Sequence, residues 1–241
     1  MNTEPSSDIV RVYVWQIPVR VTHWLIVLSI AVSSVTGIYI GHPFMTVPGQ
    51  AGQSFVMGWM KVIHGYAAYV FIAAVLARVI WMFTGNKYAR WDKFLPVHRA
   101  RRKGFLPTVS FYMFMRDQPP AYVGHNPLAG FTYVAVFVLY FVAIGTGLAM
   151  RGASADVSSF VRWFASLAPL FGGLQIARWI HHAVMWLLLG FAVHHVYSAV
   201  LMGSVEKTGT LDSIFTGYKW VPKRQLEPGS YRWMHHRELD E

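Results

Sequence analysis

Paired histidines stand near both ends of the last apolar run of this 241-residue chain. The stretch RWIHHAVMWLLLGFAVHHVYSAVLM, residues 178–202, contains two such pairs, His181 with His182 and His194 with His195. A histidine in such a run is energetically costly and indicates a functional site. Neutral imidazole is the commonest metal ligand among side chains, so metal binding is the chemistry that these residues suggest first.

Helical geometry selects one member of each pair. At about 100° per residue, His181 and His195 differ by about 40°, whereas the other cross-pairings differ by about 120° or 140°. We therefore expect His181 and His195 to share one helix face, separated by about 21 Å along the axis. His182 and His194 are expected to face lipid, a partner chain or a cofactor carboxylate.

Depth along the apolar runs then matches these two residues with histidines of earlier runs. His64 and His181 are expected near one membrane surface, and His23 and His195 near the other. Two neutral imidazoles that face each other across a helix bundle form the axial pair of a six-coordinate b-type haem. We therefore predict two haem sites. The alternative is that these histidines only form hydrogen bonds between helices. We favour it less, because four histidines in two depth-matched pairs fit haem better.

Other residues have more ordinary interpretations. We expect the remaining five histidines to be solvated or capping side chains: His42, His98, His125, His235 and His236. Five glycines either let a porphyrin approach the backbone or serve common small-residue packing: Gly37, Gly65, Gly145, Gly147 and Gly190. Three arginines either pair with haem propionates or anchor helix ends at the interface: Arg20, Arg78 and Arg178.

Four apolar runs would have to position the histidines. Only 13% of the residues are charged, about half the share of a soluble domain. Each run approaches the ~20 residues that cross a bilayer as a helix, and the runs are 19–41, 60–83, 128–150 and 176–202. We predict an all-α membrane protein, a four-helix bundle over residues 19–203, with an N-terminal segment 1–18 and a tail 204–241. Asn126 and Pro127 are expected to cap and begin the third helix.

Charge and cysteine content narrow the class of protein further. The net charge of +10 comes mainly from the segment between the second and third runs and from the tail. This asymmetry predicts that both termini are cytoplasmic, and it favours contact with anionic headgroups over nucleic-acid binding. Residues 156–171 are expected to form either an outer interfacial helix or a partner contact. The absence of cysteine excludes thiolate-bound iron–sulfur clusters and covalently attached haem from this chain.

Two stretches resemble the signatures of a known family. Residues 20–37 (RVTHWLIVLSIAVSSVTG) and 181–197 (HHAVMWLLLGFAVHHVY) resemble those of the b-type cytochrome subunit of membrane-bound nickel–iron hydrogenases. The segments KVIHGYAAYVF, GNKYAR, GHNPLAG and GYK occur in that family's order, so the resemblance covers about residues 12–220. The chain departs from the pattern at His182, where the family usually has arginine, and near residues 201–203, where an acidic pair is replaced.

The resemblance implies a role and a set of partners. A subunit of this kind lies in the bacterial cytoplasmic membrane and holds two haem b groups at the axial pairs His64–His181 and His23–His195. It receives electrons from the iron–sulfur small subunit, which accompanies the nickel–iron large subunit, and passes them to menaquinone or ubiquinone. Hydrogenase chemistry is then absent from this chain, and the oligomeric state of the complex stays open.

A quinone site would be expected beside the inner pair, where His194, Tyr197 and Trp24 offer polar and aromatic groups. The nearest alternative function is the cytochrome subunit of a formate dehydrogenase. A membrane di-iron desaturase would need its histidine boxes at one depth, which the spacing does not favour. A proton-coupled transporter that uses intramembrane histidines is a third alternative.

Overall fold

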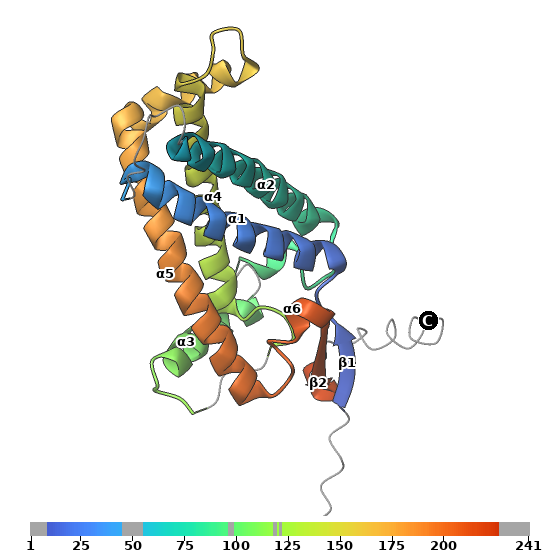
Figure 1. Cartoon of the computed structure of the whole chain (residues 1–241). Helices are drawn as coiled ribbons and strands as arrows, with labels where there is room; N and C mark the ends of the chain where they lie inside the picture. The colour runs from blue at the N-terminus through green and yellow to red at the C-terminus, as the bar shows by residue number, and fades with distance from the viewer. Residues whose placement is uncertain (1–8, 45–54, 96–98, 118–119, 121, 227–241) are drawn as a thin grey trace, which may run out of the picture. The chain divides into compact units, whose positions relative to one another are not determined.

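Four long helices dominate the computed structural model, which describes residues 9–44, 55–95, 99–117, 120 and 122–226 (Figure 1). They are α1 (Ile17–Gly41), α2 (Val56–Thr84), α4 (Pro127–Ala153) and α5 (Leu174–Glu206). All four are long and apolar enough to cross a membrane. A helix thus lies at each of the four predicted spans and extends a few residues beyond the apolar run.

The start of α4 follows the predicted cap. The side-chain Oδ1 of Asn126 accepts a hydrogen bond from the backbone N–H of Ala129 at 2.7 Å. The Asn126 carbonyl accepts the N–H of Gly130 at 2.9 Å. Pro127 occupies the first helical position, where a backbone N–H would have no partner inside the helix.

Shorter elements complete the described chain, and of these the sequence indicated only the one at residues 160–171. They are the strands β1 (Ile9–Tyr13) and β2 (Tyr218–Pro222), the helices α3 (Arg99–Tyr112) and α6 (Ser213–Thr216), and the 3-10 helices η1 (Trp91–Lys93), η2 (Phe160–Phe171) and η3 (Lys223–Gln225). The chain divides into two compact units. Unit 1 comprises residues 1–20, 80–135 and 192–241, and unit 2 comprises residues 21–79 and 136–191.

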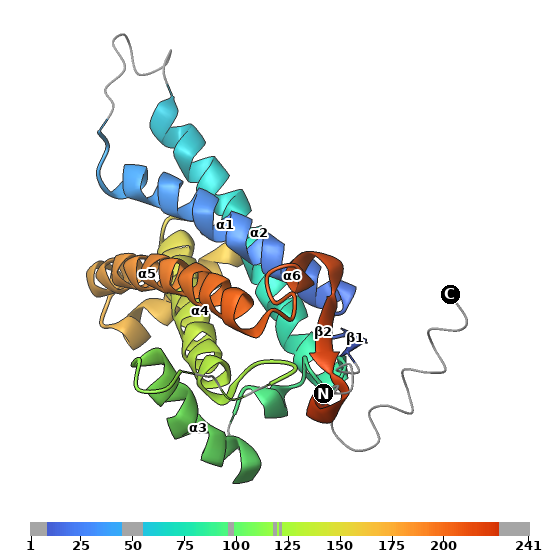
Figure 2. The ribbon, with the colours of Figure 1, turned by 90° about the horizontal axis from the view of Figure 1, so that it is seen from below.

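Unit 2 packs segments of all four long helices around one core. The core side chains are Ile26 of α1, Phe71, Ala74 and Val75 of α2, Val136 and Tyr140 of α4, and Val184 and Leu188 of α5. Helices α1 and α2 lie side by side in Figures 1 and 2. Large apolar side chains also point outward, such as Tyr66 and Trp186, which are 71% and 61% exposed. An outer surface of this kind suits lipid.

Unit 1 joins residues from both ends of the chain. Strands β1 and β2 pair antiparallel, with Ile9 opposite Pro222 and Tyr13 opposite Tyr218; Figure 1 shows this ribbon with α6 beside it. Gly217 ends α6 at φ 90°, a left-handed conformation that favours glycine. Its carbonyl accepts the N–H groups of Val14 and Trp15. The segments before the first span and after the fourth therefore form one structure.

A buried ion pair lies at the junction of α5 and this ribbon. Lys219 is 4% exposed, and its Nζ lies 3.9 Å from Oε2 of Glu206. The same oxygen accepts hydrogen bonds from the hydroxyls of Thr208 and Thr210, at 3.4 and 3.2 Å. Burial lowers the pKa of Lys219, and the nearby carboxylate opposes this shift only in part. Desolvation therefore outweighs attraction, as is common for buried pairs.

We expect Lys219→Ala to destabilise the ribbon by about 3 kcal/mol, because it leaves the Glu206 carboxylate buried without its cation. The double variant Glu206→Gln with Lys219→Met should cost much less than this. Hydrogen exchange of the β1 and β2 amides measures the effect, with the exposed Lys103→Ala as control. Unchanged ribbon protection in Lys219→Ala, or a double variant less stable than the single one, would contradict this account.

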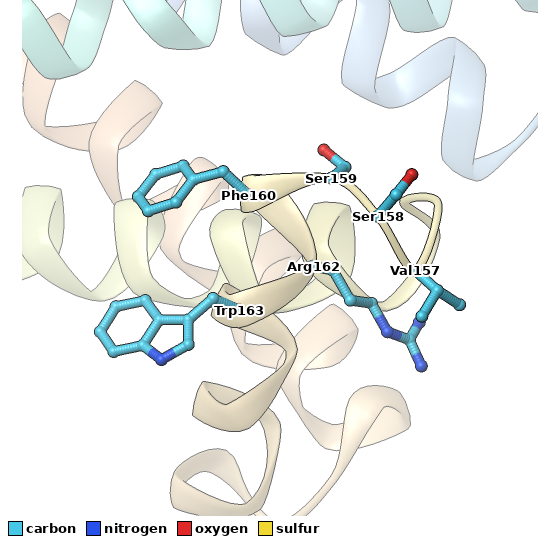
Figure 3. A pocket seen from close by; sticks show the side chains of 6 residues that line it. All are labelled: Val157, Ser158, Ser159, Phe160, Arg162 and Trp163. Atoms are coloured by element: carbon cyan, nitrogen blue, oxygen red, sulfur yellow. The ribbon is translucent and has the colours of Figure 1, made fainter.

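Helix η2 connects α4 to α5 and has one apolar side. It begins at Ser159, whose Oγ accepts the N–H of Val161, and it ends at Gly172 with φ 78°. Figure 3 shows Phe160 and Trp163 projecting from one side and Arg162 from the other. Phe160 and Trp163 are 78% and 69% exposed. Residues 160–171 of the predicted stretch 156–171 are thus helical, whereas residues 156–159 are not.

Candidate haem site

His64 of α2 and His181 of α5 face each other within unit 2. Their ring centroids are 6.3 Å apart, and the ring planes are inclined by 61°. Both side chains are half-buried. The structure thus brings together the two histidines that depth along the runs had matched.

Each of these imidazoles contacts a buried threonine through Nδ1. His64 Nδ1 lies 3.0 Å from Oγ1 of Thr36, and His181 Nδ1 lies 2.9 Å from Oγ1 of Thr146. Thr36 is on α1 and Thr146 on α4, so each histidine is held by the helix that precedes its own. With Nδ1 engaged by a side chain, Nε2 is the nitrogen left for a metal.

A glycine follows each threonine and makes room for the imidazole. A Cβ on Gly37 would lie 3.3 Å from Cε1 of His64, and a Cβ on Gly147 would lie 3.2 Å from Cε1 of His181. Both distances are tighter than ordinary van der Waals contact. These two glycines therefore admit the imidazoles, a role that the sequence did not indicate.

The pair fits haem iron. A metal bound about 2 Å from a nitrogen of each imidazole separates the two ring centres by about 6 Å, close to the observed 6.3 Å. No group of three or more His, Cys, Asp or Glu side chains that could hold a metal occurs among the described residues. Two axial imidazoles suffice for haem because the porphyrin supplies the other four ligands.

His195 lies in unit 1, beside the ring of Tyr133. The hydroxyl of Tyr133 lies 3.4 Å from Nδ1 of His195. Tyr133 in turn packs edge-on against His125, with ring centroids 4.8 Å apart. His125 also contacts Trp15 and Phe94. The expectation that His125 is a solvated or capping loop residue is therefore wrong, because its ring packs within an aromatic cluster.

His23 lies in unit 2, in edge-on contact with Trp24 at 5.1 Å between ring centroids. Because His23 and His195 belong to different units, the axial pair His23–His195 stays a prediction.

His182 has surroundings quite different from those of His181. Its Nδ1 lies 3.0 Å from the carbonyl oxygen of Arg178, one turn earlier in α5. A Cβ on Gly41 would lie 2.5 Å from its Nε2, so His182 packs against the end of α1. Of the adjacent pair, the structure therefore brings His181 to His64 and Thr146.

The remaining candidate residues are more exposed. His194 is exposed, with Nε2 3.4 Å from Oγ of Ser198, and Tyr197 is 55% exposed. His42 is an exposed residue at the end of α1. His98, His235 and His236 lie outside the described residues.

The three arginines differ in burial. Arg78 is 7% exposed inside α2, so it is not a residue of a helix end. Arg178 donates to Oε1 of Gln175, and Arg20 donates to the carbonyl oxygen of Phe215.

Thr36, Thr146 and Tyr133 contact the candidate ligands, although the sequence did not indicate them. A signal for the two threonines was present, because the dipeptide Thr-Gly occurs in the first and third apolar runs. A polar threonine beside a glycine is unremarkable in a membrane helix, and only the approach of a histidine from another helix distinguishes these two.

Comparison with known proteins shows what the chain is similar to. The model of a family described as prokaryotic cytochrome b561 matches residues 14–217. A probable Ni/Fe-hydrogenase B-type cytochrome subunit of Cupriavidus necator is 37% identical over 217 residues, which cover 89% of each chain. The subunit of the same name from Azotobacter vinelandii is 38% identical, over 86% of this chain and 88% of its own. A probable Ni/Fe-hydrogenase 1 B-type cytochrome subunit of Escherichia coli K12 is 34% identical, over 90% and 94%.

Proposed function

This chain belongs to the prokaryotic cytochrome b561 family, and we propose that it is the di-haem subunit through which a nickel–iron hydrogenase passes electrons to the membrane quinone pool. The axial residues are His64 with His181 and His23 with His195. The chain itself carries no hydrogenase chemistry.

The observation that carries the proposal is the His64–His181 pair at 6.3 Å, with each Nδ1 held by a threonine. A haem with both axial positions filled exchanges single electrons and has no position for a substrate. Electron transfer is therefore the chemistry that this pair supports.

The names of the relatives and the composition of this chain indicate the partner. The relatives are named as Ni/Fe-hydrogenase cytochrome subunits. This chain has no cysteine, so iron–sulfur clusters that supply electrons would belong to another chain. We assign the electron donor to the iron–sulfur small subunit of the hydrogenase, with the nickel–iron large subunit behind it.

The direct test is purification of the chain with its partners in mild detergent. We expect two b-type haems per chain, nickel in the same preparation, and a sharp reduced α-band when hydrogen is added. A preparation without haem would refute the proposal. Molybdenum or tungsten in place of nickel would instead indicate a formate dehydrogenase.

We expect both termini on the cytoplasmic side of the bacterial inner membrane and η2 on the outer side, with Phe160 and Trp163 facing lipid. Because the chain has no cysteine, single substitutions report on each side. A membrane-impermeant maleimide should label Arg162→Cys in intact spheroplasts and label Lys207→Cys only after lysis. The reverse pattern would exchange the inner and outer assignments of the two sites.

Quinone reduction is assigned to the inner side, near His194, Tyr197 and Trp24. Oxidation of hydrogen releases two protons and two electrons, and a quinone takes up two of each. His194 is exposed and hydrogen-bonds with Ser198, so it is available to donate a hydrogen bond or a proton to a quinone carbonyl.

We expect His194→Ala to lower hydrogen-to-quinone turnover by about 100-fold, the lower end of the range for an acid–base group, while both haems remain. The neighbouring, exposed Val193→Ala serves as control. Turnover is measured with a soluble quinone analogue. Undiminished turnover in His194→Ala would exclude this residue, and a quinone bound beside His64 and His181 would overturn the inner location.

A further inference from the structure

The dipeptides Thr36-Gly37 and Thr146-Gly147 hold His64 and His181 in the same manner. In both, the threonine hydroxyl meets Nδ1 at about hydrogen-bonding distance, 3.0 and 2.9 Å. In both, the missing Cβ of the glycine leaves room for Cε1 of the same ring. One dipeptide lies on α1 and the other on α4, so the arrangement occurs twice with no sequence continuity between the two copies.

The direction of the hydrogen bond between each threonine and its histidine follows from the acceptor of the threonine hydroxyl proton. The Thr36 hydroxyl donates to the carbonyl of Val32 at 2.8 Å, and the Thr146 hydroxyl donates to that of Val142 at 2.7 Å. A hydroxyl has one proton and two lone pairs. With its proton engaged by the helix, each threonine oxygen accepts from the imidazole, so Nδ1 carries the hydrogen.

Burial makes each threonine contact a restraint. Thr36 and Thr146 are 4% and 0% exposed, so bulk water cannot take the place of their oxygens as a hydrogen-bonding partner of the imidazole. A ring that donates to a fixed oxygen on one side and packs against a glycine on the other cannot rotate freely about its Cβ–Cγ bond. The 61° inclination between the two rings is therefore maintained by α1 and α4.

We propose that Thr36 and Thr146 are positioning residues for this site, which fix the orientation of the two imidazoles, reserve Nε2 for iron and strengthen both ligands as electron donors. This inference rests on the proposed haem function. A hydrogen bond from Nδ1–H raises the basicity of the coordinating nitrogen. Stronger donation favours ferric iron, so the two threonines hold the reduction potential of this haem at a more negative value.

The test replaces each hydroxyl by a methyl group of similar size. In Thr36→Val and Thr146→Val, the purified complex should show this haem at a more positive midpoint potential, with haem affinity lower by about 10- to 100-fold. Thr36→Ser and Thr146→Ser should restore the potential. Thr132→Val is a matched control, because Thr132 makes the same bond to the carbonyl four residues earlier in α4.

Redox titration and the low-temperature electron paramagnetic resonance spectrum are the readouts, and both are independent of turnover. If either valine variant loses haem entirely, retention of haem by its serine counterpart supports the inference. A serine variant that behaves like the valine variant would show that the threonine acts by shape alone. Unchanged potentials in both valine variants, with haem present, would overturn the inference and leave the proposed function intact, whereas a wild-type chain without haem would refute that function itself.

Discussion

In His181→Ala, the complex should contain one haem per chain instead of two, and hydrogen-dependent quinone reduction should fall to background. Alanine removes one of the two imidazoles that face each other at 6.3 Å, and one axial ligand does not hold a b-type haem in a bis-histidine site. The pyridine haemochrome assay, normalised to protein, measures the loss.

His182→Ala is the matched control for this prediction. It removes an imidazole from the adjacent position of α5, one that lies against Gly41 and the carbonyl of Arg178. We expect this variant to keep both haems. Loss of a haem in His182→Ala, with both haems retained in His181→Ala, would show that the face assignment along α5 is wrong.

His195→Ala and His23→Ala should each remove the other haem and leave the first. The remaining haem, held by His64 and His181, should still be reduced by hydrogen, because we assign it to the side where electrons enter. Quinone reduction should stop, because electrons then have no route to the inner side. The distinguishing result in both variants is that hydrogen reduces the haem held by His64 and His181, and that this haem is not reoxidised by quinone.

Two outcomes would contradict this second prediction. If His23→Ala keeps both haems while His195→Ala loses one, His195 has a different partner. If quinone reduction continues at the wild-type rate after the loss of the inner haem, the quinone site belongs to the outer side. Measuring the two variants together separates the axial pairing from the location of the quinone.

The two proposed sites also differ in the units that supply their side chains. His64 and His181 belong to unit 2, and so do their hydrogen-bonding partners Thr36 and Thr146. Perturbation of unit 1, for example by Lys219→Ala, should therefore leave the spectrum of this haem unchanged. His195 instead takes its hydrogen-bonding partner Tyr133 from unit 1. The Tyr133 hydroxyl lies 3.4 Å from Nδ1 of His195, whereas the Thr146 hydroxyl lies 2.9 Å from Nδ1 of His181, so the contact of His195 is the longer one.

The sequence by itself determined the features that depend on local pattern. Four runs of bilayer length predicted α1, α2, α4 and α5, because a helix satisfies its own backbone in lipid and run length alone indicates a span. Asn126 and Pro127 marked the start of α4 through cap chemistry that involves only neighbouring residues. The proximity of His64 and His181 also followed, because each lies near the start of its run and the second and fourth spans of a bundle cross the membrane in the same direction.

The tertiary structure alone decided the contacts between residues far apart in the chain. Val12 and Val221 pack in one core because β1 pairs with β2. A strand of five residues has too short an alternation of apolar and polar residues to predict this pairing from the sequence. From the sequence, His125 was expected to be a solvated or capping loop residue, whereas in the structure its ring packs against Trp15 and Tyr133. Thr36 and Thr146 differ from other membrane threonines only because a histidine from the next helix reaches their oxygens. The distance between the threonine oxygen and the imidazole depends on how closely two helices approach, and the spacing of residues within one helix does not determine it.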